Sequence, residues 1–282
     1  MAKISQSPAG GATESRGQAS DTNRIAHVVA VLSGKGGVGK SVVSSLLAII
    51  LQRQGYRTGI LDADITGPSI PKMFFADGAQ IGDDPLGIPP ALSRSGIKVM
   101  SINLLLRSEH EAVIWRGPLI GRAIQQFWTD VLWGQLDYLI VDMPPGTSDA
   151  SLTVMQSLPL SGVLLVTAPQ ALAGMVVRKA SQMAEMLHVP LVGLVENMSY
   201  FACPETGQRH NVFGPSHAEE LAGAIHVPFL GRLPINPELA LLSDAGRIEE
   251  YPAAEFGPIA EHVVKSAQVP RLPPFSINLK GI

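Results

Sequence analysis

The chain has 282 residues, of which 46% are hydrophobic and 16% are charged, and its formal net charge is −3. This composition predicts a globular chain with an ample core, and the slight acidity argues against a nucleic-acid-binding surface. A single cysteine excludes an intramolecular disulfide, and no apolar run approaches the ~20 residues of a membrane span. With a polar N-terminus, we expect a cytoplasmic protein without membrane or nucleic-acid partners.

The elements predicted along the chain alternate between short apolar strands and helical patterns. Residues 1–24 are rich in Ser, Gly and Ala and predict a disordered polar tail. The predicted strands are 28–32, 58–61, 97–102, 138–141, 162–167, 191–196 and 229–233. The predicted helices are 40–54, 119–132, 150–157, 171–187, 215–222, 237–245 and 253–268. Residues 269–282 contain three prolines and are expected to run extended.

This alternation predicts an α/β fold, a doubly wound and mostly parallel sheet with helices on both faces. Several strands read as continuous Val, Ile and Leu, as strands buried on both faces do. We find no repeat and no linker, so residues 25–268 are expected to form one domain. Ligands of such sheets bind outside the carboxyl ends of the strands, where the polar motifs of this chain fall.

The most informative segment is the glycine-rich stretch 34–41, which reads GKGGVGKS between a predicted strand and a predicted helix. This is the context of a phosphate-binding loop. Glycines let backbone N–H groups approach phosphate, and the following helix directs its positive end at it. Lys40 is expected to neutralise the β- and γ-phosphates, and Ser41 to ligate Mg²⁺. The remaining residues of the predicted ATP-binding loop are Gly34, Lys35, Gly36, Gly37, Val38 and Gly39.

Lys35 is not needed to hold phosphate within one subunit. A lysine at this position resembles the deviant Walker A signature of the MinD/ParA-like P-loop ATPases. In that class the lysine reaches the nucleotide of the facing subunit, so the resemblance implies a homodimer that sandwiches ATP. A cation supplied in trans at the γ-phosphate follows the logic of an arginine finger.

Three further polar motifs follow predicted strands. Asp62 and Asp64 suit Mg²⁺ organisation or positioning of the attacking water, although Asp also favours turns. Asp142 ends a Walker B strand and is placed to hold Mg²⁺ through water. Asn197 offers a donor and an acceptor that suit an adenine edge, and it is equally a turn or capping residue when read alone.

Together these segments resemble the Mrp/ApbC family of iron–sulfur cluster carrier proteins within the MinD-like class. The segments that carry the resemblance are GKGGVGKS (34–41), DADITGPS (62–69), WRGP (115–118), WGQLDYLIVDMPPGTSD (133–149), VTAPQ (166–170), VENMSYFACP (195–204) and LPINPELALLSDAGRI (233–248). The resemblance implies slow ATP hydrolysis tied to carrying a cluster to apo-proteins. It makes Lys35, Lys40 and Asp64 the catalytic residues and gives Mg²⁺ to Ser41 and Asp142. Asn197 would contact adenine, and Pro234 would lie in a loop that closes over the base.

The cargo site departs from the family pattern, in which each subunit supplies a CxxC pair to a [4Fe–4S] cluster at the dimer interface. Here Cys203 is followed by Thr206 where the second cysteine is expected. Glu205, Thr206 and His210 are near enough in sequence to substitute as ligands, since His ligates iron in Rieske centres. Cys203 is equally a small semi-buried loop residue when read alone. A second departure is Ser148, where the family has glycine.

Three functions therefore remain in competition. The first is a homodimeric, ATP-hydrolysing iron–sulfur carrier. The second is an Mrp-like ATPase switch that binds a protein client without a cluster. The third is a ParA/MinD-type positioning ATPase, which the missing amphipathic tail and scattered basic residues disfavour.

Overall fold

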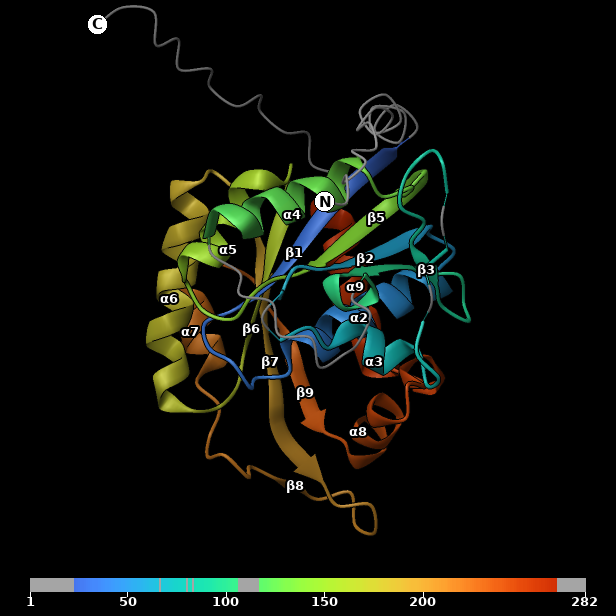
Figure 1. The fold of residues 1–282 in the computed structure, drawn as a ribbon. Coiled ribbons are helices and arrows are strands. Elements are labelled where there is room, and N and C mark those ends of the chain that lie inside the picture. Colours follow the sequence, from blue (N-terminus) through green and yellow to red (C-terminus); the bar gives the residue numbers. More distant parts are fainter. Residues whose placement is uncertain (1–22, 66, 80, 83, 106–116, 268–282) are drawn as a thin grey trace, which may run out of the picture.

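The computed structural model describes residues 23–65, 67–79, 81–82, 84–105 and 117–267 (Figure 1). The predicted extended segment 269–282, residues 1–22 of the predicted tail and residues 115–116 of the WRGP segment lie outside this part of the chain. The first strand already begins at Arg24. No helix in the described ranges is long and apolar enough to cross a membrane.

The described residues form one nine-stranded sheet, in the order β3-β4-β2-β5-β1-β6-β7-β8, with β9 beside β7. All pairs are parallel except those of the two-residue strands β3 and β8. The strands are β1 (Arg24–Ser33), β2 (Thr58–Asp62), β3 (Ala91–Leu92), β4 (Lys98–Ser101), β5 (Gln135–Asp142), β6 (Gly162–Thr167), β7 (Leu191–Ala202), β8 (Arg209–His210) and β9 (Phe229–Ile235).

Helices cover both faces of this sheet (Figure 1). One face carries α4 (Gly117–Thr129), α5 (Asp149–Ser157), α6 (Ala171–Met186) and α7 (Ala218–Ala224). The other carries α2 (Lys40–Arg53), α3 (Ile70–Phe74), α8 (Pro237–Asp244) and α9 (Gly257–Ala267). Three 3₁₀ turns complete the elements: η1 (Ile102–Leu104), η2 (Ile248–Glu250) and η3 (Ala254–Phe256). The prediction of a doubly wound, mostly parallel sheet is confirmed.

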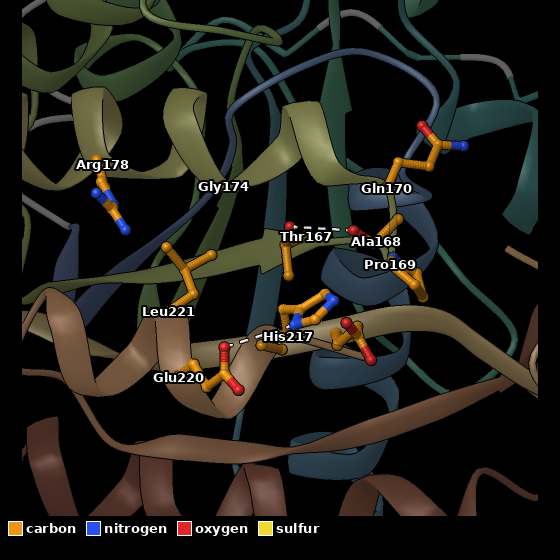
Figure 2. A pocket seen from close by; sticks show the side chains of 11 residues that line it. Thr167, Ala168, Pro169, Gln170, Gly174, Arg178, His217, Glu220 and Leu221 are labelled. Carbon is orange, nitrogen blue, oxygen red and sulfur yellow. Dashed lines mark hydrogen bonds and ion pairs between the residues drawn. The ribbon is translucent and has the colours of Figure 1, made fainter. Parts of the chain in front are cut away.

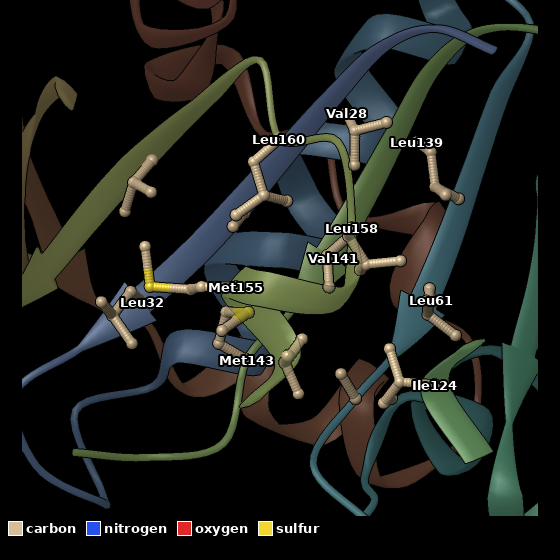
Figure 3. Close-up of a cluster of buried hydrophobic side chains, with 14 of the residues drawn as sticks. Val28, Leu32, Leu61, Ile124, Leu139, Val141, Met143, Met155, Leu158 and Leu160 are labelled. Atoms are coloured by element: carbon tan, nitrogen blue, oxygen red, sulfur yellow. The ribbon is translucent and has the colours of Figure 1, made fainter. Parts of the chain in front are cut away.

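The central strand β1 explains why the sequence reads as a continuous apolar run. Val28 and Leu32 point into the cluster under α4 to α7, which Figure 3 shows, whereas Val29 and Val31 point into the cluster under α2 and α9. Successive side chains of a strand alternate between faces, so a strand covered on both sides needs apolar residues at every position. Burial on both faces holds the carboxyl end of β1, where the glycine-rich loop starts, in a rigid frame.

All seven predicted strands and all seven predicted helices are present, β6 with the predicted bounds and the others with shifted ends. The predicted strand 191–196 continues to Ala202, and 229–233 continues to Ile235, because the two extensions pair with each other. The predicted helix 119–132 ends at Thr129, since Leu132 donates its N–H to the carbonyl of Ile88 instead. The short elements α3, β3 and β8 carry too few residues to show a period and were not predicted.

Candidate nucleotide-binding site

The glycine-rich loop joins β1 to α2, and its glycines have distinct steric reasons. Gly37 and Gly39 have φ of +78° and +76°, a conformation that L side chains rarely adopt. A Cβ on Gly39 would lie 2.2 Å from Nδ2 of Asn197, and one on Gly34 would lie 2.8 Å from the backbone of Val176. The loop is therefore packed against both β7 and α6, and larger residues at these positions would displace it.

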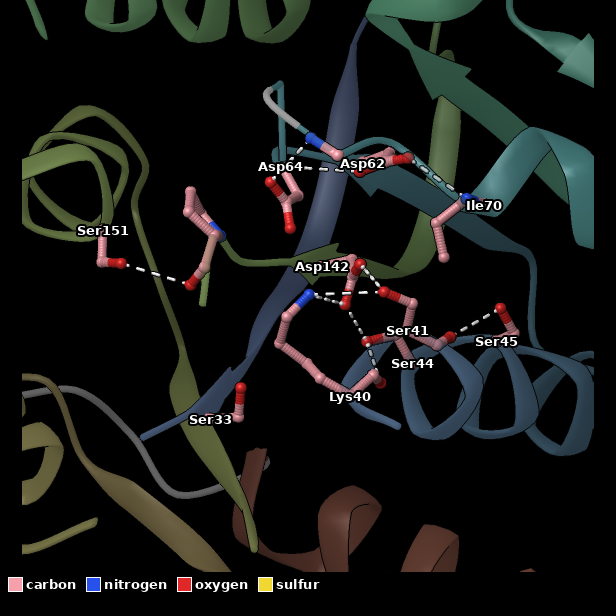
Figure 4. A network of polar contacts seen from close by, with 12 residues as sticks. Ser33, Lys40, Ser41, Ser44, Ser45, Asp62, Asp64, Ile70, Asp142 and Ser151 are labelled. Carbon is pink, nitrogen blue, oxygen red and sulfur yellow. Dashed lines mark hydrogen bonds and ion pairs between the residues drawn. The ribbon is translucent and has the colours of Figure 1, made fainter. Parts of the chain in front are cut away.

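A buried polar cluster forms directly behind the loop (Figure 4). Nζ of Lys40 lies 2.7 Å from Oδ1 of Asp142, and the two side chains are 6% and 0% exposed. The hydroxyl of Ser41 donates to Oδ2 of Asp142 at 2.5 Å, and that of Ser44 donates to Oδ1 at 2.7 Å. The structure thus brings together Lys40, Ser41 and Asp142, which lie up to 102 positions apart in the chain.

Asp62 is a second, fully buried carboxyl group beside this cluster. Its strand β2 pairs with β5 so that Asp62 lies opposite Asp142. The carboxyl oxygens accept hydrogen bonds from the backbone N–H groups of Asp64 (3.2 Å) and Ile70 (3.2 Å) and from the hydroxyl of Ser101 (3.3 Å). Burial, followed by the negative charge of Asp142, raises the pKa of Asp62 to about 8. Asp62 thereby fastens both ends of the segment that carries Asp64.

Asp64 lies on the wall of the cavity in front of the loop. It is 9% exposed, and its Oδ1 accepts the N–H of Gly67 at 3.2 Å. The cavity has a volume of about 550 Å³, which is within the range of small-molecule sites. Its polar side is formed by the loop residues and Asp64, and its apolar side by Met198, Ile235 and Leu239.

Two residues expected at the base-binding side also line this cavity, although their local structure differs from expectation. Pro234 was expected in a loop, but it belongs to strand β9 and pairs with Tyr200. Asn197 was expected at the end of a strand, but β7 continues past it, with a kink at Met198, whose φ is +53°. The amide of Asn197 donates to the carbonyl of Val38 at 2.9 Å, so it braces the loop. Contacts of either residue with adenine stay a prediction.

Lys35 lies apart from the Lys40 cluster and is half-buried. Its Nζ donates a hydrogen bond to Oε1 of Gln170, which follows strand β6. Lys35 is therefore held by its own chain on the side of the loop that faces α6. A role for Lys35 in a facing subunit stays a prediction.

Cys203 follows the carboxyl end of β7, in the turn between β7 and β8. Its N–H donates to the carbonyl of Gln208 at 2.9 Å, and its side chain is half-buried. Hydrogen bonds from the hydroxyl and N–H of Thr206 and from the N–H of Glu205 lower the pKa of the Cys203 thiol. The residue that replaces the expected second cysteine thus favours the thiolate.

The neighbours of Cys203 do not complete a metal site within one chain. No group of three or more His, Cys, Asp or Glu side chains with metal-binding geometry occurs among the described residues. Glu205 and His210 are exposed on the same hairpin. The other departure from the family pattern costs no backbone strain, because Ser148 has a φ of −77°, which any residue adopts.

Sequence reasoning did not identify two residues that the geometry brings into the site. Ser44 contacts Asp142, and its signal was its spacing of four residues from Lys40 on α2, which places both on one helix face. Gln170 holds Lys35, and its signals were its place in the segment VTAPQ (166–170) and its position after a strand that ends at the same sheet edge. The apolar wall supplied by β9 and α8 lies within the segment 233–248 that carried the family resemblance, of which only Pro234 was singled out.

Comparison with known proteins agrees with this geometry. Residues 24–268 match the family described as NUBPL iron-transfer P-loop NTPase. An iron–sulfur cluster carrier protein from Methanocaldococcus jannaschii is 43% identical, with 87% of each chain covered. The cytosolic Fe–S cluster assembly factor NUBP2 from Bos taurus is 44% identical, with 86% of this chain and 92% of the relative covered.

A solved structure shares the fold closely. The nucleotide-binding protein from Archaeoglobus fulgidus, determined in complex with ADP, is 46% identical and superposes with a TM-score of 0.74. The match covers 84% of this chain and 93% of that one. Since the family match spans the whole sheet and the loop at its centre, the chain belongs to the NUBPL-type family of iron-transfer P-loop NTPases.

Proposed function

We propose that this P-loop ATPase works as a homodimer that carries an iron–sulfur cluster and delivers it to apo-proteins in the cytoplasm. The observation that carries the ATPase part is the cluster of Lys40, Ser41 and Asp142 at the wall of a cavity of about 550 Å³. The names of the relatives, iron–sulfur carrier and cytosolic assembly factor, support the cargo and the location.

The residues present fit Mg²⁺ and ATP. Hydroxyl and carboxylate oxygens are the protein ligands that Mg²⁺ prefers, and Ser41 and Asp142 offer them in direct contact with each other. Bound Mg²⁺ would neutralise charge on the phosphates. Lys40 would exchange its ion pair with Asp142 for the phosphates, leaving Asp142 to hold the metal shell. Asp64, fixed at the cavity wall by Asp62, would orient the attacking water.

The position of Lys35 supports a mechanism that uses two subunits. Lys35 is the one loop lysine outside the Lys40 cluster, and its contact, Gln170, lies at the protein surface. Exchanging this single hydrogen bond would free Lys35 to reach the γ-phosphate of a facing nucleotide. In a symmetric dimer each subunit would thereby complete the site of the other.

The ATPase mechanism is tested with four variants of the full chain. Lys40→Ala is expected to lose ATP binding, whereas Lys35→Ala and Asp64→Ala keep binding and lose hydrolysis. Lys265→Ala, an exposed lysine on α9, is the matched control and should behave as wild type. Binding is measured by calorimetry and hydrolysis by phosphate release. Normal hydrolysis by Lys35→Ala would refute the dimer mechanism.

The thiol of Cys203, just beyond the end of β7, is the candidate ligand of the iron–sulfur cluster. A homodimer offers two Cys203 thiolates, whereas a [4Fe–4S] cluster normally takes four ligands. The lowered pKa of Cys203 favours metal binding, and Glu205 and His210 of each subunit are exposed beside it. Two thiolates together with such side chains would complete the ligand set.

The absence of a complete ligand group among the described residues of one chain favours a second candidate, an ATPase switch that binds its client without a cluster. Anaerobic reconstitution with iron and sulfide separates the two. The carrier predicts bound iron that Cys203→Ser loses and Thr206→Cys increases. No iron in wild type would exclude the carrier and leave the switch, provided that Thr206→Cys shows the reconstitution itself to work.

A further inference from the structure

A second cavity, of about 170 Å³, opens between α6 and α7, at the carboxyl end of β6 and beside the middle of β7 (Figure 2). It shares no lining residue with the nucleotide cavity. None of the nucleotide motifs accounts for it. The side chains that matter for its chemistry are Thr167, Gln170, Arg178, Glu196, His217 and Leu221.

The feature that calls for a ligand is the carboxyl group of Glu196. This residue is 1% exposed, and its Oε2 accepts the hydroxyl of Ser199 at 2.5 Å. Its other oxygen, Oε1, has no hydrogen-bond or ion-pair partner in the described part of the chain. Every fully enclosed side-chain oxygen or nitrogen in the described part of the chain has a hydrogen-bond partner. Since Oε1 of Glu196 has none, it is not fully enclosed, and we place it at the wall of the cavity that Glu196 lines. Because no protein group donates to Oε1, its hydrogen bond has to come from whatever occupies the cavity, which makes this wall a site for a donor.

The protein's own cations do not fill this role. His217 pairs with Glu220 at 3.5 Å, and both side chains are largely exposed. Arg178 lines the cavity but forms no ion pair within the described ranges, and Figure 2 shows Leu221 between it and His217. Glu220 adds a second negative group at the His217 end. The open position beside Glu196 therefore favours a cationic N–H donor.

The size of the cavity and the residues of its walls further limit the kind of ligand that it can hold. Its volume is well below the 300–1,000 Å³ typical of small-molecule sites. Leu221, Ala218 and Pro169 supply apolar walls of the kind that cover the methylene stem of a long basic side chain. Met175, next to the lining residue Gly174, is 58% exposed, and Met and Arg are enriched at protein interfaces. We propose that this cavity receives an arginine or lysine side chain of a partner protein.

The test uses the nucleotide-free full chain, labelled with ¹⁵N, and N-acetyl-arginine methylamide as the probe. N-acetyl-citrulline methylamide has nearly the same shape without the charge. We expect the arginine probe to shift the amide signals of Thr167, Ala168, Gln170 and residues 217–221 saturably, and the citrulline probe to bind at least about tenfold more weakly. Glu196→Gln should weaken arginine binding at least about tenfold, whereas Glu220→Gln at the exposed rim should change it by less than about threefold.

A binding measurement distinguishes a variant that loses the probe site from one that fails to fold. Glu196→Gln must keep wild-type ATP binding, which shows that the fold is intact. If it does not, Gly174→Leu replaces it, because a Cβ there would lie 3.9 Å from Leu221 and its side chain would fill the cavity. Loss of probe binding in Gly174→Leu supports the proposal. Equal binding of the two probes, unchanged binding to both variants, or shifts confined to the nucleotide cavity would overturn it.

Discussion

The buried carboxyl group of Asp62 makes a quantitative prediction about stability and pH. Its pKa is raised from 3.8 to about 8 in the folded protein. A raised pKa means that the folded chain holds a proton which the unfolded chain has released above about pH 4. This contribution to stability is complete below that pH and is lost as the pH rises to about 8. Over that interval the loss is about 1.4 kcal/mol per pH unit.

The substitution Asp62→Asn isolates this effect, because an amide resembles the protonated carboxyl and does not titrate. Between pH 5.5 and 7.5, wild type should lose about 3 kcal/mol of unfolding free energy relative to the variant. The assay is urea denaturation at both pH values, in EDTA and without nucleotide, followed by circular dichroism. Taking the difference between the two proteins cancels the groups that titrate independently of Asp62. Parallel pH profiles for wild type and Asp62→Asn would refute the assignment of this proton to Asp62.

The remaining predictions concern the loop and the backbone. Gly39→Ala is expected to weaken ATP binding at least about tenfold in calorimetry, because its Cβ would lie 2.2 Å from Asn197 and its φ is +76°. Asn197→Ala removes the brace on the loop and should weaken ATP binding less than Gly39→Ala does, since no clash is created. Gly246→Ala should lower the unfolding free energy by about 2 kcal/mol or more in urea denaturation, because its Cβ would lie 2.3 Å from the backbone N of Ala76 and its φ is +67°. A wild-type urea midpoint for Gly246→Ala would contradict this.

The parts of the fold that repeat a period were predictable from the sequence. Strands β1 and β5 are covered on both faces, so apart from polar residues at their carboxyl ends their buried positions are apolar, and these runs marked the centre of the sheet. The short strand β8 pairs with the end of β7 through Phe201 and Ala202, contacts that depend on a turn rather than on a local pattern. Its existence could not be read from two residues.

The candidate site, like the fold, has parts that could be predicted from the sequence and parts that could not. The loop lysine Lys40 was predictable because its chemistry requires a spacing within eight residues of chain. That Asp62 would lie opposite Asp142 depends on the register of β2 against β5, which no local motif encodes. The contact between Asn197 and Val38 likewise depends on the packing of β7 against the loop. The contacts that could not be predicted from the sequence therefore depend on strand register and packing, not on residue type.

Strand β7 has a consequence for communication across the molecule. Asn197 contacts the phosphate loop, and Cys203 follows six residues later, just beyond the end of the same strand. At ~3.3 Å per residue these positions lie at most about 20 Å apart. Salt at physiological strength screens surface charges over about 8 Å. Direct attraction or repulsion through solvent is therefore weak at this separation, whereas a displacement of the β7 backbone would link the nucleotide to the thiol.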